Sequence, residues 1–236
     1  MREGVATFVS VISRLFRGAA AGETAAEPQV SRVTRHSNGL GELSRGLRRL
    51  DGMRVLDLGP TSPQNISFFT GIGHRIHNED VLLAARDPGL LTTAPTGQAV
   101  PDVTRFLAEN LLYEAEFFDA VLCWDLADYL HADLVKPLVG RIHRILRPQG
   151  LLLGFFHTRD AGPNAPHHRY HISGDDTLEL QCIPLSAPRQ QSLRYYSYLP
   201  LQRVFNNRHI ENLFHDFSSI KFFLGRDHMR EVLVVR

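Results

Sequence analysis

The feature that most constrains the fold is a regular alternation of short apolar runs and amphipathic segments between residues 53 and 156. The runs MRVLDL, FDAVLCWD and LLLGFF begin at residues 53, 118 and 151, and each is apolar enough to be a buried strand. Residues 131–146 carry leucines and isoleucines at three- and four-residue spacing, which is the period of an amphipathic helix. Strands and helices in alternation predict a parallel sheet whose crossovers are right-handed.

Weaker signals fill the gaps in this series. A strand is expected at residues 75–78, preceded by a helix that Thr61 or Ser62 caps and that has Pro63 in its first turn. Residues 88–101 are expected to form a loop with one weak strand. Further helices are expected at residues 40–50, 81–86 and 104–112.

The last part of the chain breaks the rhythm. Residues 159–188 are rich in Pro, His and Gly and are expected to form an extended insertion or a substrate-side loop. A last helix is expected at residues 204–217, and strands at 218–224 and 231–236 flank a polar turn. The predicted fold class is therefore α/β, with a doubly wound, mostly parallel seven-stranded sheet and a C-terminal antiparallel hairpin.

Composition fits an ordinary soluble globular protein. The chain of 236 residues is 43% hydrophobic and 22% charged, with a formal net charge of +1. So small a net charge gives no general attraction to nucleic acid or to a membrane, and no concentrated basic and aromatic patch suggests nucleic-acid binding. Cys123 and Cys182 are far apart in apolar surroundings, which favours free thiols and a cytoplasmic setting.

The amino terminus, residues 1–45, is expected to be separate from a domain at residues 46–236. Residues 1–18 place apolar side chains at helical spacing between arginines. This pattern predicts an amphipathic helix that docks against the domain or a partner, or else lies on a membrane surface or serves in targeting. Residues 19–28 are small and polar, which predicts a flexible linker.

Four segments, in this order, resemble the class I S-adenosylmethionine-dependent methyltransferases. They are VLDLG at residues 55–59, the acidic pair Glu79 and Asp80, FDAVLCWD at residues 118–125 and RILRPQGLLLGFF at residues 144–156. The terminal hairpin corresponds to the sixth and seventh strands of that family, one of them antiparallel. The resemblance implies a Rossmann-like domain that binds S-adenosylmethionine outside the carboxyl ends of its central strands.

The resemblance also implies which residues contact the cofactor. Gly59 lets the backbone approach the amino-acid portion of S-adenosylmethionine, because no Cβ stands in the way, and Asp57 orients the loop backbone. An acid about 20 residues beyond the first turn binds ribose hydroxyls in such folds. Glu79 and Asp80 both lie at that separation, and Glu79 is preferred.

The first loop departs from the family pattern, which has glycines at alternate positions. It reads DLGPTSP from residue 57 to residue 63, so one glycine is kept and two are replaced. Pro60 fixes φ and removes an amide donor, and a side chain at Thr61 narrows the approach. Pro60 and Thr61 are expected to border the cofactor in a loop of altered shape, or to weaken or prevent its binding.

Asp125 and His157 are the candidate catalytic residues. Asp125 ends the clearest strand, where it is expected to act as a base, grip the substrate or border the cofactor, or else to cap a helix or form a salt bridge. His157 follows the strand at residues 151–156, where imidazole suits either proton transfer or a structural hydrogen bond. Trp124 is expected either to stack on adenine or substrate, or to belong to the core.

The histidine-rich stretch HHRYH at residues 167–171 has no Cys and no close Glu, and its spacing matches no zinc signature. No metal is therefore expected, and a mobile lid or a substrate-recognition loop is the preferred interpretation.

Two functions from different classes follow. The first is a methyltransferase that uses S-adenosylmethionine on an unidentified small molecule or protein. The alternative is a non-catalytic, methyltransferase-like scaffold or partner-binding module. Under the alternative, the protein's own side chains fill the cofactor cleft, with Phe68 or Trp124 as the expected plugs.

Overall fold

The computed structural model describes residues 32–60, 62–159, 167–183, 201–225 and 227–236. The helix expected at residues 1–18 and the linker at residues 19–28 lie outside these ranges, as does Thr61.

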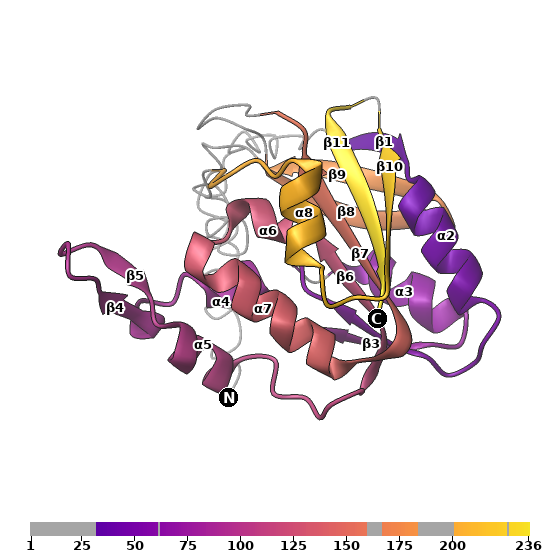
Figure 1. Cartoon of the computed structure of the whole chain (residues 1–236). Coiled ribbons are helices and arrows are strands. Elements are labelled where there is room, and N and C mark those ends of the chain that lie inside the picture. The colour runs from indigo at the N-terminus through magenta and orange to yellow at the C-terminus, as the bar shows by residue number, and fades with distance from the viewer. Residues whose placement is uncertain (1–31, 61, 160–166, 184–200, 226) are drawn as a thin grey trace, which may run out of the picture.

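A mixed sheet of six strands forms the centre of the domain (Figure 1). Its strands, in sheet order, are β10 (Ser219–Leu224), β11 (Met229–Val235), β7 (Leu146–His157), β6 (Phe118–Trp124), β2 (Arg54–Asp57) and β3 (Arg75–Asn78). The four strands from β7 to β3 are parallel, whereas β11 runs antiparallel to both β7 and β10. The strand order reverses between β2 and β6, so this is the Rossmann-like arrangement in which ligands bind at the carboxyl ends of those two strands.

The expected seventh strand is not part of this sheet in the described residues. Residues 88–101, where one weak strand was expected, instead begin with the 3-10 turn η1 (Pro88–Leu90). They continue as a separate two-stranded hairpin of β4 (Leu91–Thr93) and β5 (Ala99–Pro101). Every residue of β4 is exposed. Neither β4 nor β5 has enough apolar side chains to form a strand that is buried on both faces.

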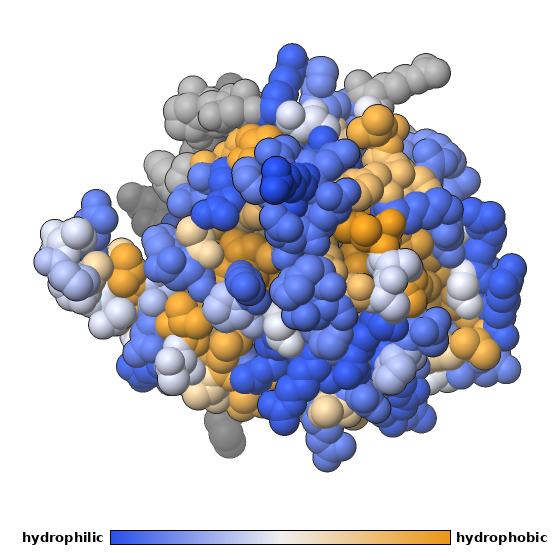
Figure 2. Space-filling model, viewed as in Figure 1, coloured by the Kyte–Doolittle hydropathy of each residue, from blue (hydrophilic) through white to orange (hydrophobic). Residues whose placement is uncertain are grey.

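Helices cover both faces of the central sheet. They are α2 (Asn38–Leu47), α3 (Pro63–Gly71), α4 (Val81–Ala84), α5 (Val103–Glu109), α6 (Leu126–Tyr129), α7 (Ala132–Ile145) and α8 (Asn207–Leu213). On one face α7 buries Leu134, Leu138 and Ile142 in the larger of two apolar clusters. Apolar side chains of this face show between α7 and α8 in Figure 2. On the other face α2 buries Leu40, Leu43 and Leu47 in the second cluster.

A second, antiparallel sheet lies where the sequence analysis expected a loop. It has the order β1 (Arg32–His36), β9 (Thr177–Ile183) and β8 (His167–Gly174). The segment at residues 159–188, expected as an extended insertion or a substrate-side loop, thus contains two paired strands at residues 167–183. On β9 alternate residues are buried, Leu178 and Leu180 among them, whereas β8 buries the consecutive residues Tyr170, His171 and Ile172.

This second sheet and α2 belong to the packed domain. Residues 32–45, which the sequence analysis grouped with the amino-terminal segment, form β1 and most of α2. The buried carboxylate of Glu231 on β11 accepts hydrogen bonds from Gly39 N over 2.6 Å and from Ser37 Oγ over 3.0 Å. Glu231 also pairs with Arg35 over 2.9 Å, so one carboxylate joins β1 and the start of α2 to the central sheet.

None of the helices in the described ranges is long and apolar enough to cross a membrane.

Candidate functional site

The carboxyl ends of β2, β3 and β6 meet at one edge of the sheet. Asp57 is the last residue of β2, Glu79 and Asp80 follow β3, and Trp124 is the last residue of β6. The sheet therefore brings together most of the residues that the resemblance assigned to a cofactor. Pro60 is half-buried in the loop after β2, and Thr61 lies outside the described residues.

Asp57 is a buried acceptor at the centre of this edge. Its Oδ1 accepts hydrogen bonds from Gly59 N over 3.1 Å and from Trp124 Nε1 over 2.6 Å. Its Oδ2 accepts a hydrogen bond from Asn65 Nδ2 over 2.8 Å. Burial raises the pKa of this carboxyl, and the hydrogen bonds offset part of that rise. Asp57 thus fixes the loop backbone, as expected, and in addition holds an indole.

The Trp124 indole lies against the Gly59 backbone, in the space that glycine leaves open. A Cβ built on Gly59 would stand 2.8 Å from Trp124 Cδ1, which is closer than side-chain carbons approach. Trp124 has a φ of 48°, a left-handed conformation that costs a bulky residue of order 1–3 kcal/mol. The hydrogen bond to Asp57 and the surrounding packing compensate for that cost and hold the ring in place.

Tyr170 of the second sheet covers the other face of the indole. The two rings are stacked, with centroids 5.0 Å apart and an interplanar angle of 2°. Tyr170 Oη donates a hydrogen bond to Asp125 Oδ2 over 2.9 Å. Trp124 is 5% exposed and Tyr170 4% exposed, so the two rings form a closed wall between the Gly59 loop and the residues that follow β6.

Polar contacts fasten the second sheet to this wall. Ile172 N donates to Asn65 Oδ1 over 2.8 Å, and Asn65 in turn donates to Asp57. Ser62 is the N-cap of α3, and its Oγ is hydrogen-bonded to His171 Nδ1 over 2.8 Å. Phe68, the other expected plug, packs edge-on against Phe69 of its own helix, with ring centroids 5.1 Å apart. Trp124, and not Phe68, is therefore the residue in the cleft.

The Glu79 side of the cleft is open. A hollow of about 360 Å³ is lined by Glu79 and Asp80, by residues 109–112 and by Tyr113. Glu79 Oε2 accepts a hydrogen bond from Leu111 N over 3.1 Å. Burial raises the pKa of the Tyr113 phenol, and its hydrogen bond to Glu79 raises that pKa further. Asp80 Oδ1 caps α4 by accepting from Leu83 N over 3.0 Å.

Asp125 and His157 lie in one buried cluster on the far side of the wall. Asp125 is 2% exposed, and burial raises its pKa to about 7, opposed mainly by the nearby charge of His157. A carboxyl group with such a pKa exchanges its proton near neutral pH, which is the property that a general acid or base needs.

Asp128 orients His157. Its Oδ2 lies 2.7 Å from both the backbone N and the Nδ1 of His157. Burial lowers the pKa of His157, but the hydrogen bond to Asp128 and the charge of Asp125 outweigh it, so the net change is upward. When Nδ1–H of the neutral ring donates its hydrogen bond to Asp128, Nε2 is the nitrogen that can accept a proton.

The fit of S-adenosylmethionine to these residues differs between the two ends of the cleft. The Glu79 side offers a carboxylate beside a hollow, which suits a ribose. The Gly59 side is filled, because the Trp124 indole stands against the glycine where the amino-acid portion of the cofactor approaches in such folds. The cofactor therefore fits only in a conformation in which the indole has left Asp57.

Comparison with known proteins gives likenesses of shape. No family model matches the chain, and no curated protein matches it. A 1,6-didemethyltoxoflavin-N1-methyltransferase from Burkholderia thailandensis, solved with 1,6-didemethyltoxoflavin and S-adenosylhomocysteine, is 16% identical over 85% of this chain and 79% of that chain, with a TM-score of 0.43. An S-adenosylmethionine-dependent methyltransferase from Mesorhizobium loti is 12% identical over 83% and 96% of the two chains, with a TM-score of 0.45. One from Methanosarcina mazei is 13% identical over 79% and 93%, with a TM-score of 0.41.

The assignment of the fold rests on the strand order and on the antiparallel β11.

Sequence reasoning missed Asp128, Asn65 and the role of Tyr170. Asp128 follows Asp125 by three residues, which places both carboxylates on one turn after β6, and that spacing was a usable signal. Asn65 reaches Asp57 from α3, and Tyr170 reaches Trp124 from β8, so both contacts join segments that no local pattern connects.

Proposed function

We propose that this chain is an S-adenosylmethionine-dependent methyltransferase acting on a small molecule or a protein. The observation that supports this best is the placement of Asp57, Glu79 and Asp125 at the ends of three neighbouring parallel strands. They flank the point at which the strand order reverses, and ligands of doubly wound sheets bind there. The open hollow beside Glu79 adds a place for the ribose.

Each residue has a defined part in the proposal. S-adenosylmethionine supplies a methyl group on a sulfonium. Glu79 accepts hydrogen bonds from the ribose, while Asp57 and Asn65 hold the loop that approaches the cofactor. His157, held by Asp128, accepts at Nε2 the proton that the methyl acceptor loses. The wall of Trp124 and Tyr170 separates Gly59 from Asp125, so it must open before the two reactants can meet.

A second candidate has its own supporting observation. A non-catalytic, methyltransferase-like module that binds a partner needs no cofactor, and in this structure Trp124 fills the Gly59 side of the cleft. Under this candidate the stack of Trp124 on Tyr170 is a permanent part of the core, and the bond to Asp57 has a structural purpose only.

Calorimetric titration with S-adenosylhomocysteine separates the candidates. The methyltransferase proposal expects saturable binding by the parent protein. It also expects Gly59→Arg to abolish that binding, because the new side chain would enter the space that Trp124 vacates. An absence of binding up to millimolar ligand would overturn the proposal and leave the non-catalytic module.

A further inference from the structure

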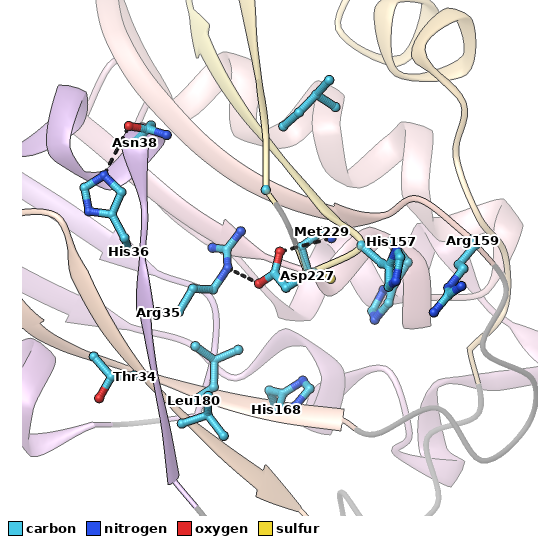
Figure 3. A pocket seen from close by; sticks show the side chains of 14 residues that line it. Thr34, Arg35, His36, Asn38, His157, Arg159, His168, Leu180, Asp227 and Met229 are labelled. Atoms are coloured by element: carbon cyan, nitrogen blue, oxygen red, sulfur yellow. Dashed lines mark hydrogen bonds and ion pairs between the residues drawn. The ribbon is translucent and has the colours of Figure 1, made fainter.

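A second cavity, of about 820 Å³, lies between the two sheets (Figure 3). One side consists of β1, β8 and β9, and the other of the end of β7 and the turn between β10 and β11. In Figure 3, His168 and Leu180 face the cavity from β8 and β9, whereas His157 and Arg159 project from the end of β7. Its lining shares no residue with that of the hollow beside Glu79.

The charged side chains that line this cavity include one cation without a counter-charge among the described residues. Asp227 is the one carboxylate among the lining residues, and it forms an ion pair with Arg35. Arg35 also pairs with the buried Glu231, so its charge is compensated from within the protein. Arg159 is exposed at the cavity and forms no ion pair with any residue that the structure describes.

An imidazole that lines the same cavity also lacks, within the described ranges, a hydrogen-bond partner for one of its nitrogens. His168 Nδ1 is buried, and it has no hydrogen-bond partner in the part of the chain that the structure describes. The ring lines the cavity, so a polar group bound there would be placed to hydrogen-bond the imidazole. Because the guanidinium of Arg159, uncompensated among the described residues, lines the same cavity, an acidic group is the complement of this site.

Apolar side chains complete the lining. Val33 is 62% exposed and Leu224 is 74% exposed, one on each side of the cavity, and the buried Leu180 and Met229 lie deeper. Exposed large apolar side chains that line a cavity form a site for an apolar body. A phosphate ion alone would leave these walls in contact with water.

We propose that this cavity binds a small organic anion, an acidic group joined to an apolar body. Arg159 and His168 contact the acid group, and Val33, Leu180 and Leu224 contact the body. The proposal does not rest on the proposed methyltransferase activity, since none of these residues belongs to the cofactor cleft. His157 lines the same cavity, so a ligand held there lies within reach of its imidazole.

A matched pair of fluorescent probes tests this site on the full-length chain. Anilinonaphthalene sulfonate carries an anionic group on an apolar body, and phenylnaphthylamine has the same body without the charge. We expect one-to-one, saturable binding of the sulfonate and binding of the neutral probe that is weaker by roughly tenfold or more, as the loss of a charged hydrogen bond requires.

Arg159→Gln tests the assigned contact, and Arg75→Gln, at an exposed position on β3, is the control. Arg159→Gln should weaken the sulfonate roughly tenfold to a hundredfold and leave the neutral probe unchanged. Arg75→Gln should change neither. Equal affinity for the two probes, or equal effects of the two substitutions, would overturn the proposal. Because neither probe resembles S-adenosylhomocysteine, failure here is distinguishable from failure of the cofactor titration.

Discussion

Trp124 Nε1 donates a hydrogen bond to Asp57 Oδ1 over 2.6 Å, and this bond joins the ends of β6 and β2 across the reversal of strand order. The indole thereby occupies the position that ligands take in doubly wound sheets. Since Tyr170 covers its other face, the conformation described here is a closed one.

Trp124→Ala should open the cleft. A ligand that binds only the open form has its affinity reduced by the fraction of closed molecules, so we expect the variant to bind S-adenosylhomocysteine roughly tenfold more tightly or better. Trp124→Phe keeps a ring but loses the hydrogen bond to Asp57, so its affinity should lie between those of the parent and of Trp124→Ala. Loss of a buried Trp costs about 3–5 kcal/mol of stability, so circular dichroism must first show that the variant is folded. Equal affinity of both variants and the parent would contradict a closing role for the indole.

Glu79→Ala and Asp80→Ala should differ in cofactor affinity. Glu79 lines the open hollow, whereas Asp80 caps α4. Loss of a charged hydrogen-bond acceptor should weaken S-adenosylhomocysteine roughly tenfold to a hundredfold for Glu79→Ala. Asp80→Ala should instead cost about 1 kcal/mol of stability, as loss of a helix cap does. Calorimetry and urea unfolding measure the two effects, and similar affinities for both variants would rule out Glu79 as the ribose ligand.

Asp125 should make the protein less stable as the pH rises toward neutrality. Its pKa is about 7 in the folded protein against 3.8 in the unfolded chain. The folded state therefore binds the proton more tightly, and the stability that this contributes is complete below pH 3.8 and is lost as the pH rises to about 7. Asp125→Asn keeps an acceptor for Tyr170 Oη and removes this titration.

Urea unfolding of both proteins from pH 4 to pH 8 measures the effect. The variant should gain on the parent as the pH rises, and then run parallel to it above about pH 7. Because the charge of His157 is coupled to Asp125, the comparison reports the pair. A constant difference in the free energy of unfolding across this range would show that Asp125 is ionised throughout.

Glu231→Ala should be the most destabilising of the carboxylate substitutions. It leaves the buried Arg35 with a partner only in Asp227, and it removes the acceptor of Ser37 and Gly39. Breaking a buried ion pair costs about 3–5 kcal/mol. Glu179→Ala removes an exposed ion pair with Arg32 and should cost about 0–1 kcal/mol. Similar urea midpoints for the two variants would contradict the role of Glu231 in joining the two sheets.

The parallel part of the central sheet could be predicted from sequence because its signals are local. The runs that became β2, β6 and β7 are apolar along nearly their whole length, as strands buried on both faces must be. Asp57 and Asp125 were assigned from the same runs, because Asp57 ends β2 and Asp125 follows β6, whereas Glu79 was assigned from its separation of 22 residues from Asp57. The prediction of a seventh strand in the central sheet failed because residues 88–101 lack an apolar run of that kind.

The strand β8 gave no clear signal because most of its buried residues are polar or aromatic. On β9 the alternation of the buried Leu178 and Leu180 with polar residues was a usable strand signal that the sequence analysis missed. On β8 the buried residues include His167, Tyr170 and His171, which read as loop residues by hydropathy. Their burial depends on α3 and the central sheet, which are distant in sequence. The stacking of Tyr170 on Trp124 was not predicted for the same reason, because the two residues are distant in sequence.

Fluorescence of Trp124 during titration with S-adenosylhomocysteine tests the central claim most directly. The claim is that the cofactor cleft exists and that Trp124 closes it. Trp124 is the only tryptophan in the chain, so the whole indole signal reports its position. The account predicts a saturable red shift of the emission as the indole leaves its buried stack on Tyr170, with the same midpoint as in calorimetry. Calorimetric binding with an unchanged emission spectrum would contradict it.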